Sequence, residues 1–215
     1  MTYKHLSAFA VATALSIGAL AQPKPAPLPA LNIDPTQTTV SGISAGGYMA
    51  VQLHVAYSSK FGKGVAAVAG GPFNCAEGSV VTALTRCFGK TAIPVDALIE
   101  GTKKMAEEKS IDPLPGLGRS AVYLFSGAKD SVIPAATSEA LAKYYAAFLP
   151  EKNIIFKRDI PAEHGFVTDE GTAGCDNKAA PFLNNCGFDL AKHILAHLYG
   201  WVSMRKQPEP DGTLL

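Results

Sequence analysis

The sequence predicts an α/β fold, in which a mostly parallel sheet is covered by helices on both faces. Short apolar runs of strand length alternate along the chain with longer stretches of helical periodicity. Three of the four predicted strands lack a clear polar–apolar alternation, which is typical of strands that are buried on both faces. The 215 residues are 47% hydrophobic, so the chain can bury a sizeable core and is not expected to be disordered.

The predicted elements alternate regularly between the two types. The apolar runs predict strands at residues 38–42, 64–69, 120–125 and 153–160. The helical stretches are residues 48–58, 94–109, 134–148 and 188–199. No internal repeat interrupts this series, and the length fits one domain.

The amino terminus has the pattern of a secretory signal peptide. Lys4 precedes an uncharged apolar stretch at residues 6–20, and Ala19 and Ala21 are the small residues that a cleavage site after position 21 requires. The alternative is an anchoring helix, but a membrane span needs about 20 apolar residues and this stretch is shorter. We therefore expect a secreted protein, either extracellular or periplasmic.

The remaining chain divides by composition. Prolines at every second position make residues 22–36 a stiff, extended lead-in. We expect residues 37–200 to form the catalytic domain and residues 201–215 to be a tail. With 19 basic and 18 acidic side chains, the chain has no global attraction to nucleic acid, and after signal cleavage we expect no membrane attachment.

Four cysteines allow three disulfide pairings. The pairs Cys75–Cys87 and Cys175–Cys186 close the shortest loops, and an oxidising compartment favours bridges over free thiols. Neither pair has the close spacing of a zinc knuckle, so we expect no metal and no other cofactor.

A G-x-S-x-G motif at residues 42–46 stands between a predicted strand and a predicted helix. In that context the sharp turn presents Ser44 as a nucleophile, and its two glycines avoid collisions with the neighbouring strand and helix. The hydroxyl would lie at a helix amino terminus, where developing negative charge is stabilised. A five-residue match also arises by chance in ordinary Gly/Ser-rich turns, and it is the strand–turn–helix context that favours function.

A serine nucleophile needs a base that is oriented by an acid, and in the α/β-hydrolase arrangement the chain order is Ser, Asp or Glu, then His. Asp130 follows the predicted strand 120–125, and His164 follows the predicted strand 153–160. Because catalytic groups gather at the carboxyl ends of parallel strands, Ser44, Asp130 and His164 are the predicted catalytic residues.

Other carboxylates fit this order less well. Asp159 lies inside a predicted strand, and Asp169 and Glu170 follow His164 in the chain. Glu163 is adjacent to His164, and we expect it to tune the surroundings of the imidazole.

The remaining histidines also have alternative interpretations. His54 lies about three helical turns from Ser44, too far for the base. His193 and His197 are four residues apart on the last predicted helix and could share a metal, but helical histidines more often serve ordinary packing or surface roles.

The segment Ser-Gly-Ile-Ser-Ala-Gly-Gly-Tyr-Met-Ala-Val-Gln at residues 41–52 closely resembles the nucleophile segment of secreted poly(3-hydroxybutyrate) depolymerases and related esterases. Further matches lie at residues 69–75, 126–130, 164–169 and 184–187. The resemblance implies an α/β-hydrolase fold with Ser44 as nucleophile, His164 as base and Asp130 as orienting acid. It also implies the Ala45 N–H as an oxyanion donor, the two local disulfides, and short-chain hydroxyacid polyesters or their oligomers as substrates.

The chain departs from an ordinary α/β-hydrolase because too few residues precede residue 38 to form the usual early strands. The family resemblance implies a circular permutation that places those strands after the last helix. The chain ends at Leu215, so we expect a partial sheet that lacks the permuted strands and the second oxyanion donor, and that self-associates through an exposed edge.

Three functional hypotheses remain from the sequence. The first is a secreted serine esterase that acts on poly(3-hydroxybutyrate) or similar oligomers through an acyl-enzyme. The second is a carbohydrate esterase that releases feruloyl or acetyl groups with the same triad. The third is a truncated, non-catalytic, hydrolase-like secreted binding protein.

Overall fold

The computed structural model describes residues 31–200, and a compact unit begins at Asp34. The predicted signal peptide at residues 1–21, most of the lead-in and the tail at 201–215 lie outside the described residues. No helix within residues 31–200 is long and apolar enough to cross a membrane.

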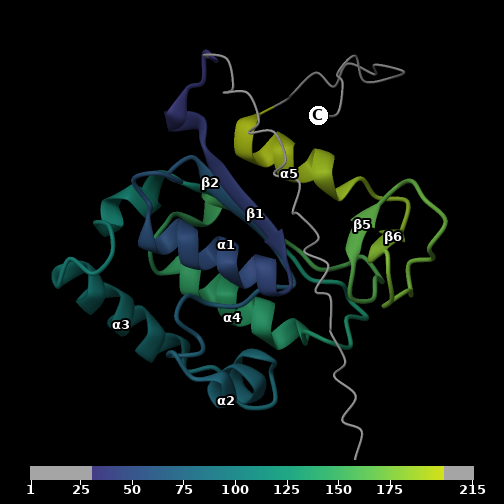
Figure 1. Cartoon of the computed structure of the whole chain (residues 1–215), viewed down its shortest axis with the longest axis horizontal. Coiled ribbons are helices and arrows are strands. Elements are labelled where there is room, and N and C mark those ends of the chain that lie inside the picture. The colour runs from purple at the N-terminus through teal and green to yellow at the C-terminus, as the bar shows by residue number, and fades with distance from the viewer. Residues whose placement is uncertain (1–30, 201–215) are drawn as a thin grey trace, which may run out of the picture. The chain divides into compact units, whose positions relative to one another are not determined.

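The core of the unit is a four-stranded parallel sheet whose spatial order follows the chain order (Figure 1). Its strands are β1 (Thr39–Ile43), β2 (Gly64–Val68), β3 (Ala121–Phe125) and β4 (Ile154–Lys157). A single row of paired residues, Ser41, Ala66, Tyr123 and Ile155, crosses all four strands and fixes their register. The parallel sheet predicted from the apolar runs is therefore confirmed.

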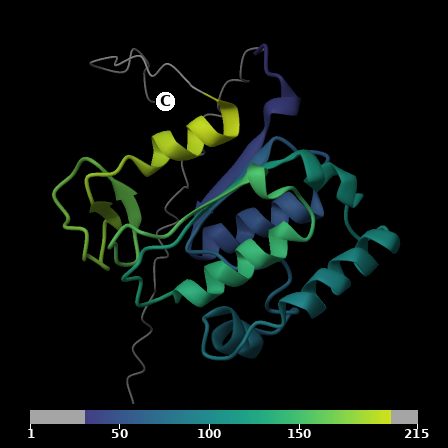
Figure 2. The ribbon, with the colours of Figure 1, turned by 180° about the vertical axis from the view of Figure 1, so that it is seen from behind.

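Helices cover both faces of this sheet (Figures 1 and 2). Three of them, α1 (Ala45–Ala56), α3 (Val95–Glu107) and α4 (Ala135–Ala146), belong to one core cluster. The fourth, α5 (Leu190–Tyr199), packs in a second cluster. Right-handed crossovers between strands in sequential order place the first three on one face.

The strands contribute to the two clusters by alternation. Val65 and Val122 lie in the cluster of α1, α3 and α4, whereas the next residues, Ala66 and Tyr123, lie in the cluster of α5. Both faces are apolar because each is covered, which explains the absence of a polar–apolar alternation in the sequence.

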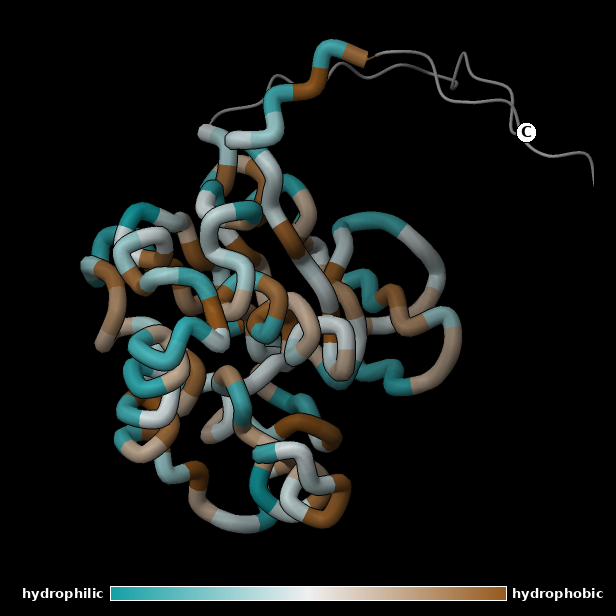
Figure 3. The backbone as a smooth tube through the Cα atoms, turned by 60° about the vertical axis from the view of Figure 1, so that its left-hand side comes forward, coloured by the Kyte–Doolittle hydropathy of each residue, from teal (hydrophilic) through white to brown (hydrophobic). Residues whose placement is uncertain are grey.

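The outer helix α3 shows how an exposed helix fits this arrangement. Its buried residues are Val95, Leu98, Ile99 and Thr102, and that spacing places them on one side of the helix. Along the tube in Figure 3, teal hydrophilic stretches alternate with brown hydrophobic ones.

Several short elements were not predicted from the sequence. The helical turn α2 (Val80–Thr82) continues into a π-helical turn at Ala83–Cys87. A second, two-stranded parallel sheet consists of β5 (Phe166–Thr168) and β6 (Leu183–Asn185). The predicted fourth strand was too long, because β4 ends at Lys157 and Asp159 lies in the loop that follows.

Two disulfides stabilise these short elements. Cys75–Cys87 joins the loop after β2 to the π-helical turn, and Cys175–Cys186 joins the loop after β5 to the end of β6. The structure therefore contains both local bridges of the expected pairing.

Candidate active site

Ser44 occupies a sharp turn between β1 and α1. Its φ of 55° and ψ of −124° lie outside the regions that L-residues normally adopt, so the backbone is strained there. Two hydrogen bonds hold the turn: Ser44 N–H donates to the Val68 carbonyl at 2.9 Å, and Tyr48 N–H donates to the Ser44 carbonyl at 3.0 Å. This strand–turn–helix geometry is the context that the sequence motif requires.

The glycines around Ser44 have different roles. A Cβ on Gly42 would collide with the backbone of Gly46, and a Cβ on Gly47 would lie 2.7 Å from the Val68 carbonyl oxygen. A Cβ on Gly46 would meet nothing within 4 Å. The expected steric role is confirmed for Gly42 and is wrong for Gly46, since close packing against β2 involves the next residue, Gly47.

Asp130 lies in the loop between β3 and α4, and both of its carboxylate oxygens are engaged. Oδ1 accepts hydrogen bonds from the backbone N–H groups of Val132 at 2.9 Å and Ile133 at 2.8 Å. Oδ2 lies 2.9 Å from Nδ1 of His164. The Asp130 side chain is only 2% exposed, so its orientation is fixed by these contacts.

His164 lies in the loop that follows β4, and its side chain is 11% exposed. A carboxylate only accepts hydrogen bonds, so Nδ1 donates to Asp130 and the neutral ring presents Nε2 as its acceptor. That is the tautomer in which an imidazole can accept a proton from a serine hydroxyl.

The three predicted catalytic residues come from loops that follow β1, β3 and β4. The carboxyl ends of these parallel strands lie at the same end of the sheet. The structure brings Asp130 and His164 into direct contact. Within residues 31–200, no hydrogen bond joins Ser44 to His164. Ala45, the predicted oxyanion donor, is the first residue of α1, where helix geometry leaves the backbone N–H without an intrahelical acceptor.

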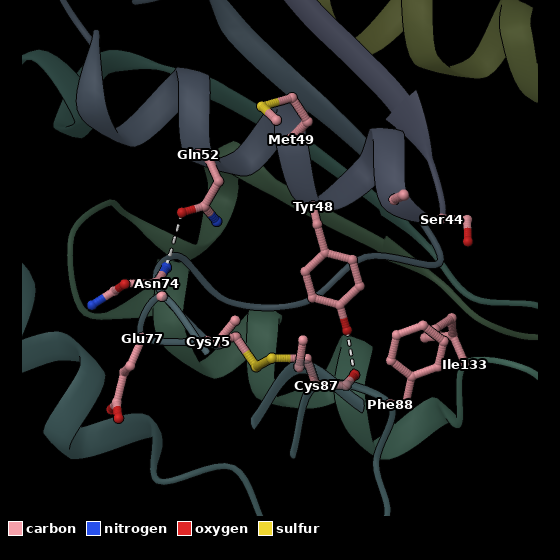
Figure 4. Close-up of a pocket in the computed structure, with 14 residues that line it drawn as sticks. Ser44, Tyr48, Met49, Gln52, Asn74, Cys75, Glu77, Cys87, Phe88 and Ile133 are labelled. Carbon is pink, nitrogen blue, oxygen red and sulfur yellow. Dashed lines mark hydrogen bonds between the residues drawn. A yellow bond between two sulfur atoms is a disulfide. The ribbon is translucent and has the colours of Figure 1, made fainter. Parts of the chain in front are cut away.

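A cavity of about 370 Å³ opens beside Ser44 (Figure 4). Met49 on α1, Phe88 and Ile133 supply apolar walls, and the Cys75–Cys87 bridge closes one side. This cavity could not be predicted from the sequence, because its walls come from separate segments of the chain.

The polar side chains around the cavity are largely engaged with protein groups. The Tyr48 hydroxyl donates to the Cys87 carbonyl, and burial raises the pKa of Tyr48, so it remains a protonated donor. The Gln52 Oε1 atom accepts a hydrogen bond from Asn74 N–H at 3.1 Å. The cavity therefore presents a mainly apolar surface to a ligand.

The other histidines that the structure describes have structural contacts away from this cavity. His54 is fully buried on α1, and its Nδ1 lies 2.9 Å from the Tyr145 hydroxyl. The ring of His193 stacks on Phe188, whereas Nε2 of His197 lies 3.1 Å from the Asn153 carbonyl. Within residues 31–200, no group of three or more His, Cys, Asp or Glu side chains is placed to hold a metal.

Two curated proteins are similar to most of this chain. A poly(3-hydroxybutyrate) depolymerase of Delftia acidovorans is 51% identical over 190 residues, which is 87% of this chain and 38% of the relative. A polyhydroxybutyrate depolymerase of Talaromyces funiculosus is 31% identical over 208 residues, which is 95% of this chain and 60% of the relative. This chain is homologous to the poly(3-hydroxybutyrate) depolymerases. The resemblance seen in the sequence is confirmed.

Solved depolymerase structures extend the similarity to the fold. The crystal structure of the PHB depolymerase from Penicillium funiculosum matches with a TM-score of 0.76 at 31% identity, covering 87% of this chain and 57% of that one. A serine-to-alanine PHB depolymerase variant complexed with an R3HB trimer matches with a TM-score of 0.74 at 30% identity, with the same coverage. The fold is therefore of the α/β-hydrolase type, as predicted.

The chain spans between about two-fifths and three-fifths of the length of the curated relatives. No protein-family model matches the sequence.

Proposed function

We propose that this chain is a secreted serine esterase that hydrolyses ester bonds of poly(3-hydroxybutyrate) or of similar short-chain hydroxyalkanoate oligomers. The observation that carries the proposal is the hydrogen bond between Asp130 and His164. It lies at the same end of the sheet as the strained turn that presents Ser44. The depolymerase homologues support the ester bond as the target, and the R3HB trimer bound to one relative supports an oligoester substrate.

In the proposed mechanism, Ser44 Oγ attacks the ester carbonyl while Nε2 of His164 accepts its proton. The tetrahedral oxyanion is stabilised by the Ala45 N–H at the start of α1. His164 then returns the proton to the leaving alcohol as the C–O bond breaks, which leaves an acyl group on Ser44. Water, deprotonated by His164, attacks this acyl-enzyme, and Ser44 regains its proton as the acid is released. Asp130 stabilises the imidazolium at both stages.

The cavity beside Ser44 suits the apolar parts of a polyester. Hydroxyalkanoate units carry alkyl groups and ester carbonyls but few donors, so they match walls formed by Met49, Phe88 and Ile133. A feruloyl or acetyl polysaccharide presents many hydroxyl groups that would need unengaged polar partners. The apolar lining therefore favours the polyester over the carbohydrate ester.

Export of the protein is part of the proposal. The leader at residues 1–21 and the two disulfides are both typical of proteins that fold in an oxidising compartment.

A fluorophosphonate probe tests the proposed nucleophile directly. We expect the probe to label the wild-type chain at Ser44, and the labelled peptide to be absent from Ser44→Ala and strongly reduced in His164→Ala. The wild type should release 3-hydroxybutyrate oligomers from the polyester and leave feruloylated polysaccharide unchanged. A chain that folds but is neither labelled nor active on any ester would instead support the non-catalytic binding protein.

A further inference from the structure

Glu163 lies between the end of β4 and His164, and it contributes to the site through its side chain. A single carboxylate oxygen, Oε2, accepts two backbone hydrogen bonds. One comes from the N–H of His164 at 2.9 Å, and the other comes from the N–H of Ser131 at 3.1 Å.

The two donors belong to different loops. Ser131 directly follows Asp130 in the loop after β3, and His164 carries the proposed base in the loop after β4. One oxygen atom of Glu163 therefore joins the backbone beside the proposed acid to the backbone of the proposed base.

This link continues a series of backbone contacts between the same two loops. Ala128 N–H donates to the Ile160 carbonyl at 2.8 Å, and Lys129 N–H donates to the Ala162 carbonyl at 3.1 Å. At the next step, at Ser131 and His164, the connection between the loops passes through the Glu163 carboxylate. The contacts of Ala128 and Lys129 join the two loops where they leave the strands, and Glu163 joins them beside the proposed catalytic groups.

The backbone of Glu163 is itself anchored. Its N–H donates to the Cys175 carbonyl at 2.9 Å, and its carbonyl accepts from the Asn184 side-chain amide at 3.3 Å. The carboxylate thus starts from a fixed position. Partial burial raises the pKa of Glu163, but hydrogen bonds from Ser131 and His164, with the nearby charge of Lys178, outweigh it and keep that pKa below its usual value.

We propose that Glu163 is a positioning residue that sets the distance and angle of the Asp130–His164 hydrogen bond by clamping the two loops together. The proposal rests on the proposed esterase function, since it assigns Asp130 and His164 their catalytic roles. Glu163 does not line the cavity beside Ser44, so its effect should fall on turnover and leave substrate binding unchanged.

Two substitutions separate positioning from the negative charge itself. Glu163→Gln keeps an oxygen that can accept both N–H bonds, whereas Glu163→Ala removes it. We expect Glu163→Ala to lower kcat on a soluble short-chain ester by roughly 10- to 100-fold with KM unchanged, as misplacement of a catalytic group by about 1 Å does. Glu163→Gln should keep most of the wild-type kcat, and its pH–rate profile should stay close to that of the wild type.

Glu151, an exposed acid at the opposite end of β4, offers a matched control. Glu151→Ala should leave kcat, KM and the melting temperature unchanged. If Glu163→Ala lowers only the melting temperature and leaves kcat unchanged, Glu163 is merely structural and the positioning role is overturned. If Glu163→Gln is as impaired as Glu163→Ala, the charge is what matters, and the clamp is also overturned.

A second measurement does not depend on turnover. The imidazole proton shared by His164 and Asp130 should give a low-field proton NMR resonance that is missing in His164→Ala. We expect this resonance to persist in Glu163→Gln and to broaden by solvent exchange in Glu163→Ala; an unchanged resonance in Glu163→Ala would refute the clamp. A wild-type chain that shows this behaviour but hydrolyses no ester would refute the proposed function and leave the clamp supported.

Discussion

At the scale of single residues, hydrogen bonds hold the side chains and the backbone of the site in one conformation. Asp130 engages both carboxylate oxygens, so that it can present His164 with only one geometry. Ser44 keeps its strained backbone because β2 and α1 each hold it with a hydrogen bond. Strain of this kind persists only where the surrounding structure determines it.

The glycines of the turn give a matched pair of substitutions. Gly42→Ala should lower the free energy of unfolding by about 1–3 kcal/mol, because its Cβ meets the Gly46 backbone. Gly46→Ala should stay within about 1 kcal/mol of the wild type, since its Cβ enters open space. Chemical denaturation measures both. Equal destabilisation by the two variants would contradict the roles assigned here.

The buried His54 predicts a pH dependence of stability. Burial lowers the pKa of His54 to about 4, well below the value near 6.5 that is expected in the unfolded chain. Between these two values the unfolded state binds more protons than the folded state, so the free energy of unfolding falls as the pH is lowered from about 6.5 to 4, by about 3 kcal/mol in all.

Denaturant titrations at a series of pH values test this contribution. The variant His54→Gln keeps a polar partner for the Tyr145 hydroxyl but does not titrate in this range. Its stability should fall less steeply with acid than that of the wild type. Parallel curves for the two proteins would show that His54 does not cause the slope.

At the scale of elements, the long segments could be predicted from the sequence and the short ones could not. Apolar runs and helical spacing located all four strands of the main sheet and α1, α3, α4 and α5 to within a few residues. β5 and β6 have three residues each, too few for any periodicity to be recognised. Chain order and strand ends also indicated Ser44, Asp130 and His164, but the cavity and the Glu163 contacts arise only from tertiary packing.

The two disulfides lie beside different parts of the site, and this predicts different kinetic effects. Serine substitution of Cys175 and Cys186 should lower kcat, because the Cys175 carbonyl accepts the backbone N–H of Glu163 beside the proposed base. Serine substitution of Cys75 and Cys87 should mainly raise KM, because that bridge forms a wall of the cavity.

Each loss should also lower the free energy of unfolding by about 3 kcal/mol, because each bridge, which joins cysteines 12 or 11 residues apart, restricts the unfolded chain. Steady-state kinetics on a soluble ester and thermal melts of both double variants provide the comparison. The same change in kcat and KM for both variants would show that the bridges act through stability alone.

At the scale of the whole molecule, the sheet has two different edges within residues 31–200. β4 includes Lys157, and Lys152 and Arg158 lie beside it, so charge protects that edge. β1 has the sequence Thr-Val-Ser-Gly-Ile, carries no charge, and pairs among the described strands with β2 alone. An edge of this kind is a template for pairing with a further strand.

We therefore expect the recombinant chain to self-associate through β1. Light scattering should give an apparent mass above that of one chain, which is 22.5 kDa for all 215 residues, and this mass should rise with concentration. Ser41→Lys, at an exposed position of β1, should reduce this association, whereas Thr91→Lys, exposed elsewhere, should not. A monodisperse monomer for the wild type would contradict the prediction.

The sequential strand order also determines how the sheet can be assembled. Because neighbours in the sheet are neighbours in the chain, β2, β3 and β4 can each add to an edge that already exists as the polypeptide emerges, without waiting for a distant segment. Each disulfide likewise closes between residues no more than 12 apart, so its cysteines can meet soon after both have emerged. The architecture thus suits folding from the amino terminus onward, in which Ser44 comes first and His164 completes the proposed triad last.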